Sequence, residues 1–474
     1  MPTDHPAGET YDLAVIGGGS AGYAAARTAV SEGLRTAVVE GGREVGGLCI
    51  LRGCMPSKTL IESANRLLSM KDAAEFGLRC ESPRAILPEV IARKRRLIGE
   101  FADYREGQLR DGRFDFVRGF ARFTGPDTVT IRPMDGSPEF TLHARSFVIT
   151  TGSTHAVPPV SGLAETGFLT SDDILEAESL PDSLIVLGAG PVALEMAHYA
   201  AAVGVRVTII QRSPHFLSGV DTDVSKVVKD SFSRRGMKIF TGTKIENVYR
   251  GQDGQCRVSF SHEGKTKEVA AEAVFNGLGR IPATDQLGLS AAGVKLDGRT
   301  IVTAPTQQTS SSHIFAAGDV CGPFEVVHIA ITQGEIAARN AARLLRGEPA
   351  SEEADCRLFL FAVFTEPQVA VVGLGEDQAH ERGLDVITAS YPFGDHGKSL
   401  VMAEEHGMVK LIADRATRKI LGGSAVGPHA SELIHEIVVA MAFHSTADQL
   451  AKIPHYHPTL SEIWTYPAEE LAEC

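Results

Sequence analysis

The sequence is poor in the features of secreted and membrane-spanning proteins. Its 474 residues include only seven cysteines and one tryptophan. An odd number of cysteines spread over a long chain does not suit a secreted disulfide framework. A membrane span needs ~18 apolar residues without charges, and the most apolar stretch, 183–210, is interrupted by Glu195 and Arg206. We therefore expect a globular protein of more than one domain.

Positive charge is also scarce. The net charge is −13, which disfavours nucleic acid and anionic membrane surfaces as partners. The first ten residues, MPTDHPAGET, lack the basic start and apolar block of a signal peptide. The expected compartment is the cytoplasm.

Two glycine-rich turns, about 170 residues apart, stand between apolar strands and Ala-rich helices. Such turns let the backbone approach a pyrophosphate and aim the positive end of a helix at it. They predict an α/β fold with two dinucleotide-binding units. The first unit spans strands 12–16 and 35–40, with Gly17, Gly19 and Gly22 between them; the second spans strands 183–187 and 205–210, with Gly188, Gly190 and Ala193.

The residue at the end of the second strand in each unit indicates which dinucleotide the unit binds. Glu40 and Gln211 stand at the same distance after their turns. A carboxylate suits the unphosphorylated ribose of FAD or NAD. Gln211 is neutral and is followed by Arg212, which can pair with a 2′-phosphate and favours NADP. The alternative is that Arg212 is an ordinary solvated arginine.

Cys49 and Cys54 are the only closely spaced cysteines. Pro56 suits the first turn of a helix, so Cys54 is expected at a helix entrance, where the dipole stabilises a thiolate. A regular helix holds residues five apart at ~8.5 Å, beyond the ~7 Å reach of a disulfide. Glycines 46, 47 and 53 must therefore let the chain distort, and the bond would be readily reduced. Two inert buried thiols are the alternative, and a zinc site fits poorly because a second cysteine pair is lacking.

A histidine near the C-terminus completes the candidate chemistry. The segment from His455 to Glu462 contains His457, which can take and return a proton near neutral pH. Glu462 is expected to hold its other ring nitrogen. Without the cysteines, a surface histidine would be the simpler interpretation.

Together these motifs resemble the pyridine nucleotide–disulfide oxidoreductases, and the resemblance covers essentially the whole chain. The lipoamide dehydrogenase branch is the most similar. The resemblance implies two Rossmann-like domains, for FAD and NAD(P), and a C-terminal α+β dimerisation domain. The implied boundaries are 1–150 for the first part of the FAD domain, 151–275 for the NAD(P) domain, 276–350 for a central domain completing the FAD site and 351–474 for the interface domain. The motifs that carry it are Gly17–Gly22 with Glu40, Cys49 and Cys54, Thr150–Ser153, Gly188–Glu195, Gly279–Pro282, Ala316–Asp319 and His457–Glu462.

The resemblance also implies roles for single residues. Cys49, Cys54, His457 and Glu462 would be catalytic, with His457 and Glu462 reaching Cys49 of a second subunit in a homodimer. Lys58 and Glu195 would form an ion pair beside the flavin, and no metal is implied. FAD would contact Gly17, Gly19, Gly22, Glu40, Lys58, Ala121, Thr151, Gly152 and Asp319, and NAD(P) would contact Gly188, Gly190, Ala193, Glu195, Gln211, Arg212 and Gly279.

The implied activity transfers electrons between a small or protein-bound lipoyl dithiol and NAD(P)⁺ through Cys49–Cys54 and FAD. Departures from the family pattern leave alternatives open. Leu48 stands where Thr is usual, Arg52 adds a charge between the cysteines, and Gln211 replaces an acid. One alternative is an NADPH-dependent reductase of another disulfide, persulfide or sulfur compound. The other is a catalytically silent flavoprotein scaffold or redox sensor.

Overall fold

The computed structural model describes residues 10–474. The segment 1–9, on which the expectation of no signal peptide rests, lies outside the described residues. The chain forms two compact units, each built from three segments. Unit 1 comprises residues up to 56, 93–156 and 279–354, and unit 2 comprises 57–92, 157–278 and 355–474.

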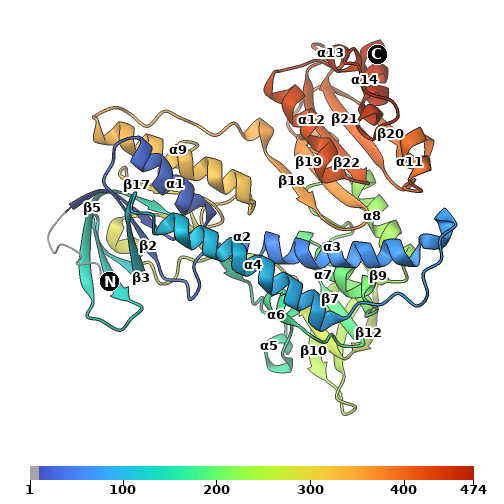
Figure 1. Ribbon diagram of the computed structural model, residues 1–474, viewed down its shortest axis with the longest axis horizontal. Coiled ribbons are helices and arrows are strands. Elements are labelled where there is room, and N and C mark those ends of the chain that lie inside the picture. The colour runs from blue at the N-terminus through green and yellow to red at the C-terminus, as the bar shows by residue number, and fades with distance from the viewer. Residues whose placement is uncertain (1–9) are drawn as a thin grey trace. The chain divides into compact units, whose positions relative to one another are not determined.

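A six-stranded sheet organises unit 1 (Figure 1). Its parallel core is formed by β1, β2, β5 and β17, and the hairpin of β3 and β4 joins β2 back to β5. Small and β-branched residues fill the buried strands, as expected for strands covered on both faces. The bounds are β1 Thr10–Ile16, β2 Thr36–Glu40, β3 Asp115–Gly125, β4 Thr128–Pro133, β5 Phe140–Ile149 and β17 Ile314–Ala316.

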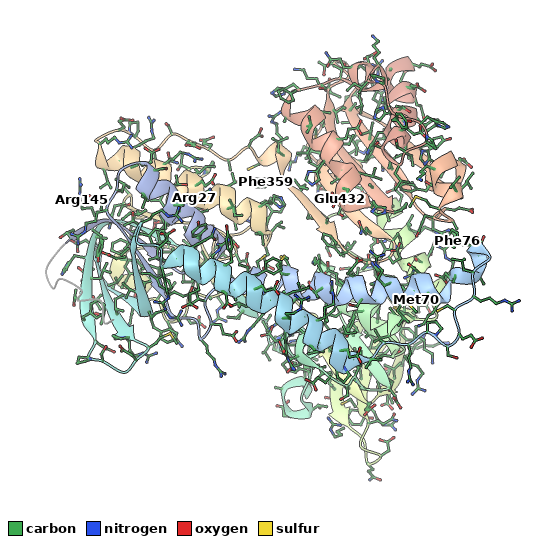
Figure 2. All side chains as sticks on the ribbon, in the orientation of Figure 1. Arg27, Met70, Phe76, Arg145, Phe359 and Glu432 are labelled. Carbon is green, nitrogen blue, oxygen red and sulfur yellow. The ribbon has the colours of Figure 1, made fainter. Side chains whose placement is uncertain are left out.

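The register brings the carboxyl ends of these strands to one edge. Ile16 pairs with Val39 of β2 and with Ile149 of β5, and Ile149 also pairs with Ala316. At the opposite, polar end of the pair, Arg145 of β5 forms an ion pair with Asp12 of β1 (Figure 2). Loops that follow the carboxyl ends of parallel strands form ligand sites in α/β sheets.

Helices α1 (Ser20–Ser31) and α9 (Val327–Leu345) pack against each other in unit 1. A Cβ atom on Gly334 of α9 would lie 2.4 Å from the carbonyl oxygen of Ala21, so only glycine permits this approach. Arg27 of α1 pairs with Glu335 of α9 at the rim (Figure 2). Other elements of this unit are α2 Gly47–Leu51, β6 Ser153–His155, β14 Arg280–Pro282, η2 Leu289–Ala292, β15 Leu296–Asp297 and β16 Thr300–Ile301.

Two long helices cross the unit boundary along the chain. They are α3 (Cys54–Lys71) and α4 (Leu87–Leu109), with η1 (Ala73–Phe76) between them. Helix α3 begins at Cys54, as the sequence predicts.

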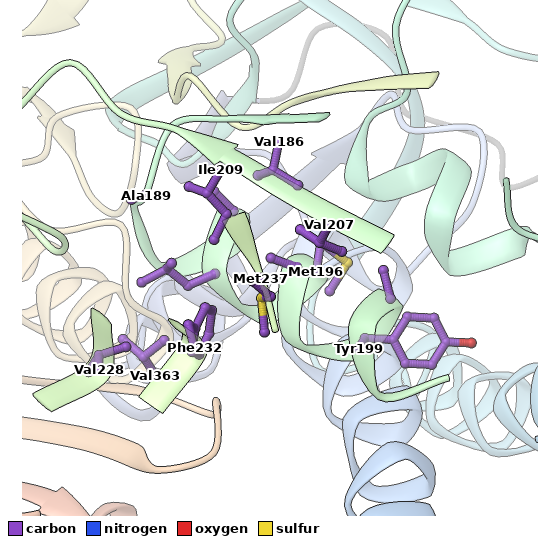
Figure 3. Packing of buried hydrophobic residues seen from close by; sticks show 14 of the residues in the cluster. Val186, Ala189, Met196, Tyr199, Val207, Ile209, Val228, Phe232, Met237 and Val363 are labelled. Atoms are coloured by element: carbon purple, nitrogen blue, oxygen red, sulfur yellow. The ribbon is translucent and has the colours of Figure 1, made fainter. Parts of the chain in front are cut away.

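Unit 2 contains a second parallel sheet in the order β13-β7-β8-β9. Its core packs Val186, Met196, Val207, Ile209 and Phe232 between the sheet and its helices (Figure 3). An antiparallel sheet of β10, β11 and β12 accompanies it. The bounds are α5 Leu163–Thr166, α6 Ser171–Glu176, β7 Ser183–Leu187, α7 Pro191–Ala202, β8 Arg206–Ile210, α8 Thr222–Arg234, β9 Lys238–Phe240, β10 Lys244–Arg250, β11 Cys256–His262, β12 Lys265–Ala271 and β13 Ala273–Asn276.

The C-terminal part of unit 2 is a five-stranded antiparallel sheet in the order β18-β19-β22-β21-β20. Helix α12 packs on β19 and β22, and the fully buried Trp464 donates its indole N–H to the Leu433 carbonyl at 3.0 Å. The bounds are η3 Cys356–Leu358, β18 Leu360–Val363, β19 Gln368–Gly373, α10 Glu376–Glu381, β20 Val386–Pro392, η4 Phe393–Asp395, α11 Gly397–Val401, β21 Met408–Asp414, β22 Ile420–Gly427, α12 Ala430–Ala442, α13 Ala447–Ala451, η5 Ser461–Trp464 and α14 Thr465–Glu473.

The apolar stretch 358–372 contains two strands that pair as a hairpin, β18 and β19, rather than one extended strand. The sequence Glu366–Pro367 lies between the two strands, and proline cannot donate to a sheet ladder. Between residues 10 and 474, no helix combines the length and apolar character needed to cross a bilayer.

Candidate active site

The first glycine turn is held closed by the end of β5. Gly17 has φ +111°, and a Cβ atom on Gly22 would lie 1.8 Å from the Gly17 carbonyl oxygen. The Thr150 hydroxyl donates to that same oxygen at 2.8 Å. The N-cap residue of helix α1 is Gly19, so the helix has no side-chain cap, and its first turn contains no acid. Its amide groups therefore suit a pyrophosphate.

Glu40 lies beside this turn. Its Oε2 accepts from the Gly18 amide at 2.7 Å and its Oε1 from the Gly42 amide at 2.5 Å. These bonds fix the carboxylate at the sheet edge, with lone pairs remaining on both oxygens for ribose hydroxyls. The turn and Glu40 thus fit the diphosphate and ribose of FAD.

Asp319 follows β17 at the same edge. Its Oδ2 accepts from the Ser153 hydroxyl at 2.6 Å, and Ser153 in turn accepts from Arg280 Nε at 2.8 Å. The sequence prediction includes Asp319 but misses Ser153 and Arg280. Both lie in motifs that were noted, yet nothing in the spacing shows that they would meet.

The other predicted FAD contacts in unit 1 occupy loops and one strand. Thr151 donates to the Ala283 carbonyl at 2.9 Å, and Gly152 has φ +69°. Ala121 lies on β3, paired with Ile131 of β4. Their contacts with FAD remain predictions.

The second glycine turn has alanine, Ala193, at the position of the third glycine, and a neighbouring glycine provides the space for it. A Cβ atom on Gly277 would lie 2.6 Å from the Ala193 methyl group. The missing side chain at Gly277 therefore makes room for alanine where the fingerprint has its third glycine. The N-cap residue of helix α7 is Gly190, so this helix too has no side-chain cap, and its first turn contains no acid. The turn therefore fits a second dinucleotide.

Gln211 and Arg212 stand at the ribose end of this second turn. The buried Gln211 amide donates to the His215 carbonyl at 3.3 Å, and Arg212 is exposed. Gly279, which was predicted for the nicotinamide nucleotide, begins the last segment of unit 1, with φ +111°. Its role remains a prediction.

The cysteine segment folds back on itself in unit 1. Cys49 lies in α2 and Cys54 begins α3. Gly46 and Gly47 have φ +141° and +74°. Gly53 contributes space rather than a left-handed backbone, because a Cβ atom there would lie 3.2 Å from Cys49 Cα. The chain next to Cys54 is thereby pressed against Cys49.

The same segment contacts the first glycine turn. A Cβ atom on Gly47 would lie 2.6 Å from Gly19 Cα. The short helix that carries Cys49 therefore starts against the N-terminus of α1. Arg105 of α4 also interacts electrostatically with Cys49; burial lowers the pKa of Arg105, and the electrostatic interactions with Tyr23 and Cys49 oppose that shift.

Lys58 and Glu195 form the predicted ion pair within unit 2. Lys58 Nζ lies 2.9 Å from both Glu195 oxygens. Glu195 is buried and also accepts from the Phe364 amide at 3.0 Å, while Lys58 Nζ lies 4.7 Å from the centre of the Phe364 ring. The structure thus adds Phe364 to the pair. Lys58 follows Cys54 by about one turn of α3, and the position beside a flavin remains a prediction.

His457 and Glu462 also pair in unit 2. His457 Nδ1 lies 3.0 Å from Glu462 Oε2, the Glu462 side chain is 11% exposed, and that of His457 is 78% exposed. The pair therefore presents Nε2 of the imidazole outward. His455, to which no role was assigned, contacts Glu436 at 2.7 Å and the Ile453 carbonyl at 2.9 Å.

Comparison with known proteins decides the family. Residues 11–334 match the model described as pyridine nucleotide-disulphide oxidoreductase, and residues 361–468 match the dimerisation domain of the same family. The chain belongs to the pyridine nucleotide-disulphide oxidoreductase family. The dihydrolipoyl dehydrogenases of Mycobacterium leprae and Bacillus subtilis are 35% and 32% identical to it, over 95% of this chain and 96% of each relative.

Solved structures agree with this membership. LpdA from Mycobacterium tuberculosis superposes with a TM-score of 0.85 at 29% identity, over 97% of this chain and 99% of that one. The HOCl-induced flavoprotein disulfide reductase RclA from Escherichia coli, in its Cu(II) complex, gives 0.84 at 26% identity, over 98% and 99%. The chain is an FAD-dependent disulfide oxidoreductase that uses a nicotinamide nucleotide, and its dimerisation domain supports a homodimer.

Gly22→Ala tests whether the first turn holds FAD. The new methyl group would meet the Gly17 carbonyl at 1.8 Å, so the turn must open. We expect the variant to lose most of its bound FAD and about 1–3 kcal/mol of unfolding free energy. Flavin absorbance and urea unfolding measure both effects. Gly99→Ala, in open space on the exposed face of α4, is the matched control and should gain about 0.5–1 kcal/mol; equal FAD content in the two variants would contradict the assignment.

Proposed function

We propose that the chain oxidises a dithiol of the lipoyl class by exchange with a Cys49–Cys54 disulfide, or regenerates that dithiol from its disulfide by exchange with the reduced Cys49 and Cys54. The observation that carries this proposal is the contact between the helix of Cys49 and the first glycine turn. A sulfur pair at this place would lie next to the turn that fits the dinucleotide. The dihydrolipoyl dehydrogenase relatives support the substrate class. FAD, when bound, would take the electron pair from the reduced sulfurs and deliver it as hydride to NAD(P)⁺.

The residues of the chain supply the sulfur and proton chemistry. His457 Nε2 takes a proton from one substrate thiol, and the resulting thiolate attacks Cys49 Sγ. The Cys49–Cys54 bond breaks, and Cys54 leaves as a thiolate favoured by the α3 N-terminus. The second substrate thiol then loses its proton and displaces Cys49, which is protonated as the substrate disulfide closes. In the reductase direction, each step reverses.

Two chains are required in this proposal. His457 and Glu462 of one chain would serve Cys49 of the second chain. Glu462 holds Nδ1, so that Nε2 is the atom that exchanges protons. We infer a cytoplasmic enzyme, and the net charge of −13 supports partners that are neither nucleic acid nor membrane.

A second candidate is an NADPH-dependent reductase of another disulfide or persulfide. The neutral Gln211 and the exposed Arg212 favour NADPH as the nucleotide, because neither side chain repels a 2′-phosphate. The E. coli neighbour described as a flavoprotein disulfide reductase also supports it.

An assay of both nucleotides separates the two candidates. Dihydrolipoamide with NAD⁺ or NADP⁺, and a panel of disulfides with NADH or NADPH, should each give a kcat/KM. We expect NADP(H) to be used, and Arg212→Ala to lower its kcat/KM about tenfold while sparing NAD(H), since one charge-assisted bond would be lost. An unchanged ratio in Arg212→Ala would remove this residue from nucleotide choice. Turnover of dihydrolipoamide below that of every disulfide would favour the second candidate.

A further inference from the structure

A second histidine lies behind Glu462. His396, between η4 and α11, has no exposed side-chain surface. Its Nε2 lies 3.3 Å from Glu462 Oε1, and the same carboxylate contacts the exposed imidazole of His457. This contact has no signal in the sequence, because the two residues are 66 positions apart.

The other ring nitrogen of this imidazole contacts Ser399. The Ser399 hydroxyl lies 2.9 Å from His396 Nδ1, and both side chains are fully buried. A neutral imidazole with its proton on Nε2 lets the hydroxyl donate to Nδ1 and lets Nε2–H face the carboxylate. The opposite tautomer would aim a lone pair at a negative charge.

The surroundings favour the neutral form. Burial lowers the pKa of His396, and the charge of His457 acts in the same direction, whereas Glu462 opposes the shift. The remaining ring that packs against His396 is Tyr466 of α14, with centroids 6.3 Å apart. The neutral His396 therefore places Nε2 3.3 Å from Glu462 Oε1 without competing as a second cation for the carboxylate.

We propose that His396 is a positioning residue for the sulfur half-reaction, holding the Glu462 carboxylate against His457 from the protein interior. This inference rests on the proposed function of His457. It assigns the pair a third member and a fixed orientation, since Glu462 Oε1 lies 3.2 Å from His457 Nδ1 and 3.3 Å from His396 Nε2.

The electrostatic consequence has a definite sign. The Nε2–H group places the positive end of a dipole at Glu462. Its removal makes the potential at the pair more negative, which favours the protonated imidazole of His457. Dithiol oxidation needs the neutral imidazole. When the pH is lowered, the rate should therefore begin to fall at a higher pH than in the native protein.

The test uses the FAD-loaded dimer and dihydrolipoamide under anaerobic conditions. His396→Phe keeps a ring but removes the donor, and His396→Gln keeps an amide donor near the Nε2 position. We expect the acid midpoint of the pH–rate profile to rise by about 0.5–1 pH unit in His396→Phe and to return to the native value in His396→Gln. Rates are expressed per bound flavin, and thermal unfolding reports the fold.

The outcomes distinguish the possible failures. A lowered melting temperature with the native midpoint in His396→Phe would make His396 a structural residue only and overturn the inference. If His457→Gln left the rate of the sulfur half-reaction unchanged, the proposed proton transfer by His457 would be wrong, and the role of His396, which rests on it, would be wrong as well. A shifted midpoint that His396→Gln does not restore would also overturn the donor role.

Discussion

Replacement of Cys49 by serine is expected to abolish dithiol oxidation while leaving the protein folded and yellow with FAD. The hydroxyl cannot form the mixed disulfide that the proposed exchange requires, and loss of a nucleophile typically costs about 10³-fold or more in turnover. FAD should remain, because the Cys49 side chain is not part of the glycine turn. Steady-state oxidation of dihydrolipoamide and the flavin-to-protein ratio measure the two effects.

Cys474→Ser is the matched control for this substitution. Cys474 is exposed at the end of the chain, after α14, and its removal should leave turnover unchanged. If Cys49→Ser retained more than a few per cent of native dithiol oxidation, another sulfur would have to perform the exchange. Cys321 is a poor substitute, because burial raises the pKa of its thiol to about 12.

The sequence predicts most of the fold because its signals are local. The two strand–turn–helix units have glycines at fixed offsets and apolar strands on either side, and both form with bounds within a few residues of those expected. The start of α3 at Cys54 follows from Pro56 two positions later. Glu40 and Gly18 meet because neighbouring parallel strands end at the same edge.

The sequence does not predict contacts between distant segments. Ser153 lies between Asp319 and Arg280 only after β6 pairs with β14. The space for Ala193 depends on Gly277, which follows a strand far along the chain. His396 reads as a loop histidine, and only its burial beside Glu462 gives it a role. Such pairings depend on tertiary packing, for which a single sequence contains no periodicity.

The second large effect is expected for His457→Gln. Glutamine retains an amide that can bond Glu462 but cannot take and return a proton. General acid–base catalysis contributes about 10²–10⁴-fold, so dihydrolipoamide oxidation should fall by that factor. The measurement is kcat for dihydrolipoamide oxidation by the variant and the native protein at the same pH.

His455→Gln is the control that isolates the proton role of His457. It lies two residues away, and its nitrogens already contact Glu436 and the Ile453 carbonyl. Glutamine there should keep dithiol turnover within about twofold, although some stability will be lost because the His455 side chain is only 9% exposed. Equal losses in both variants would mean that the loop, rather than the imidazole of His457, is what the reaction needs. A loss confined to His457→Gln would place the proton transfer on Nε2, because Glu462 already occupies Nδ1.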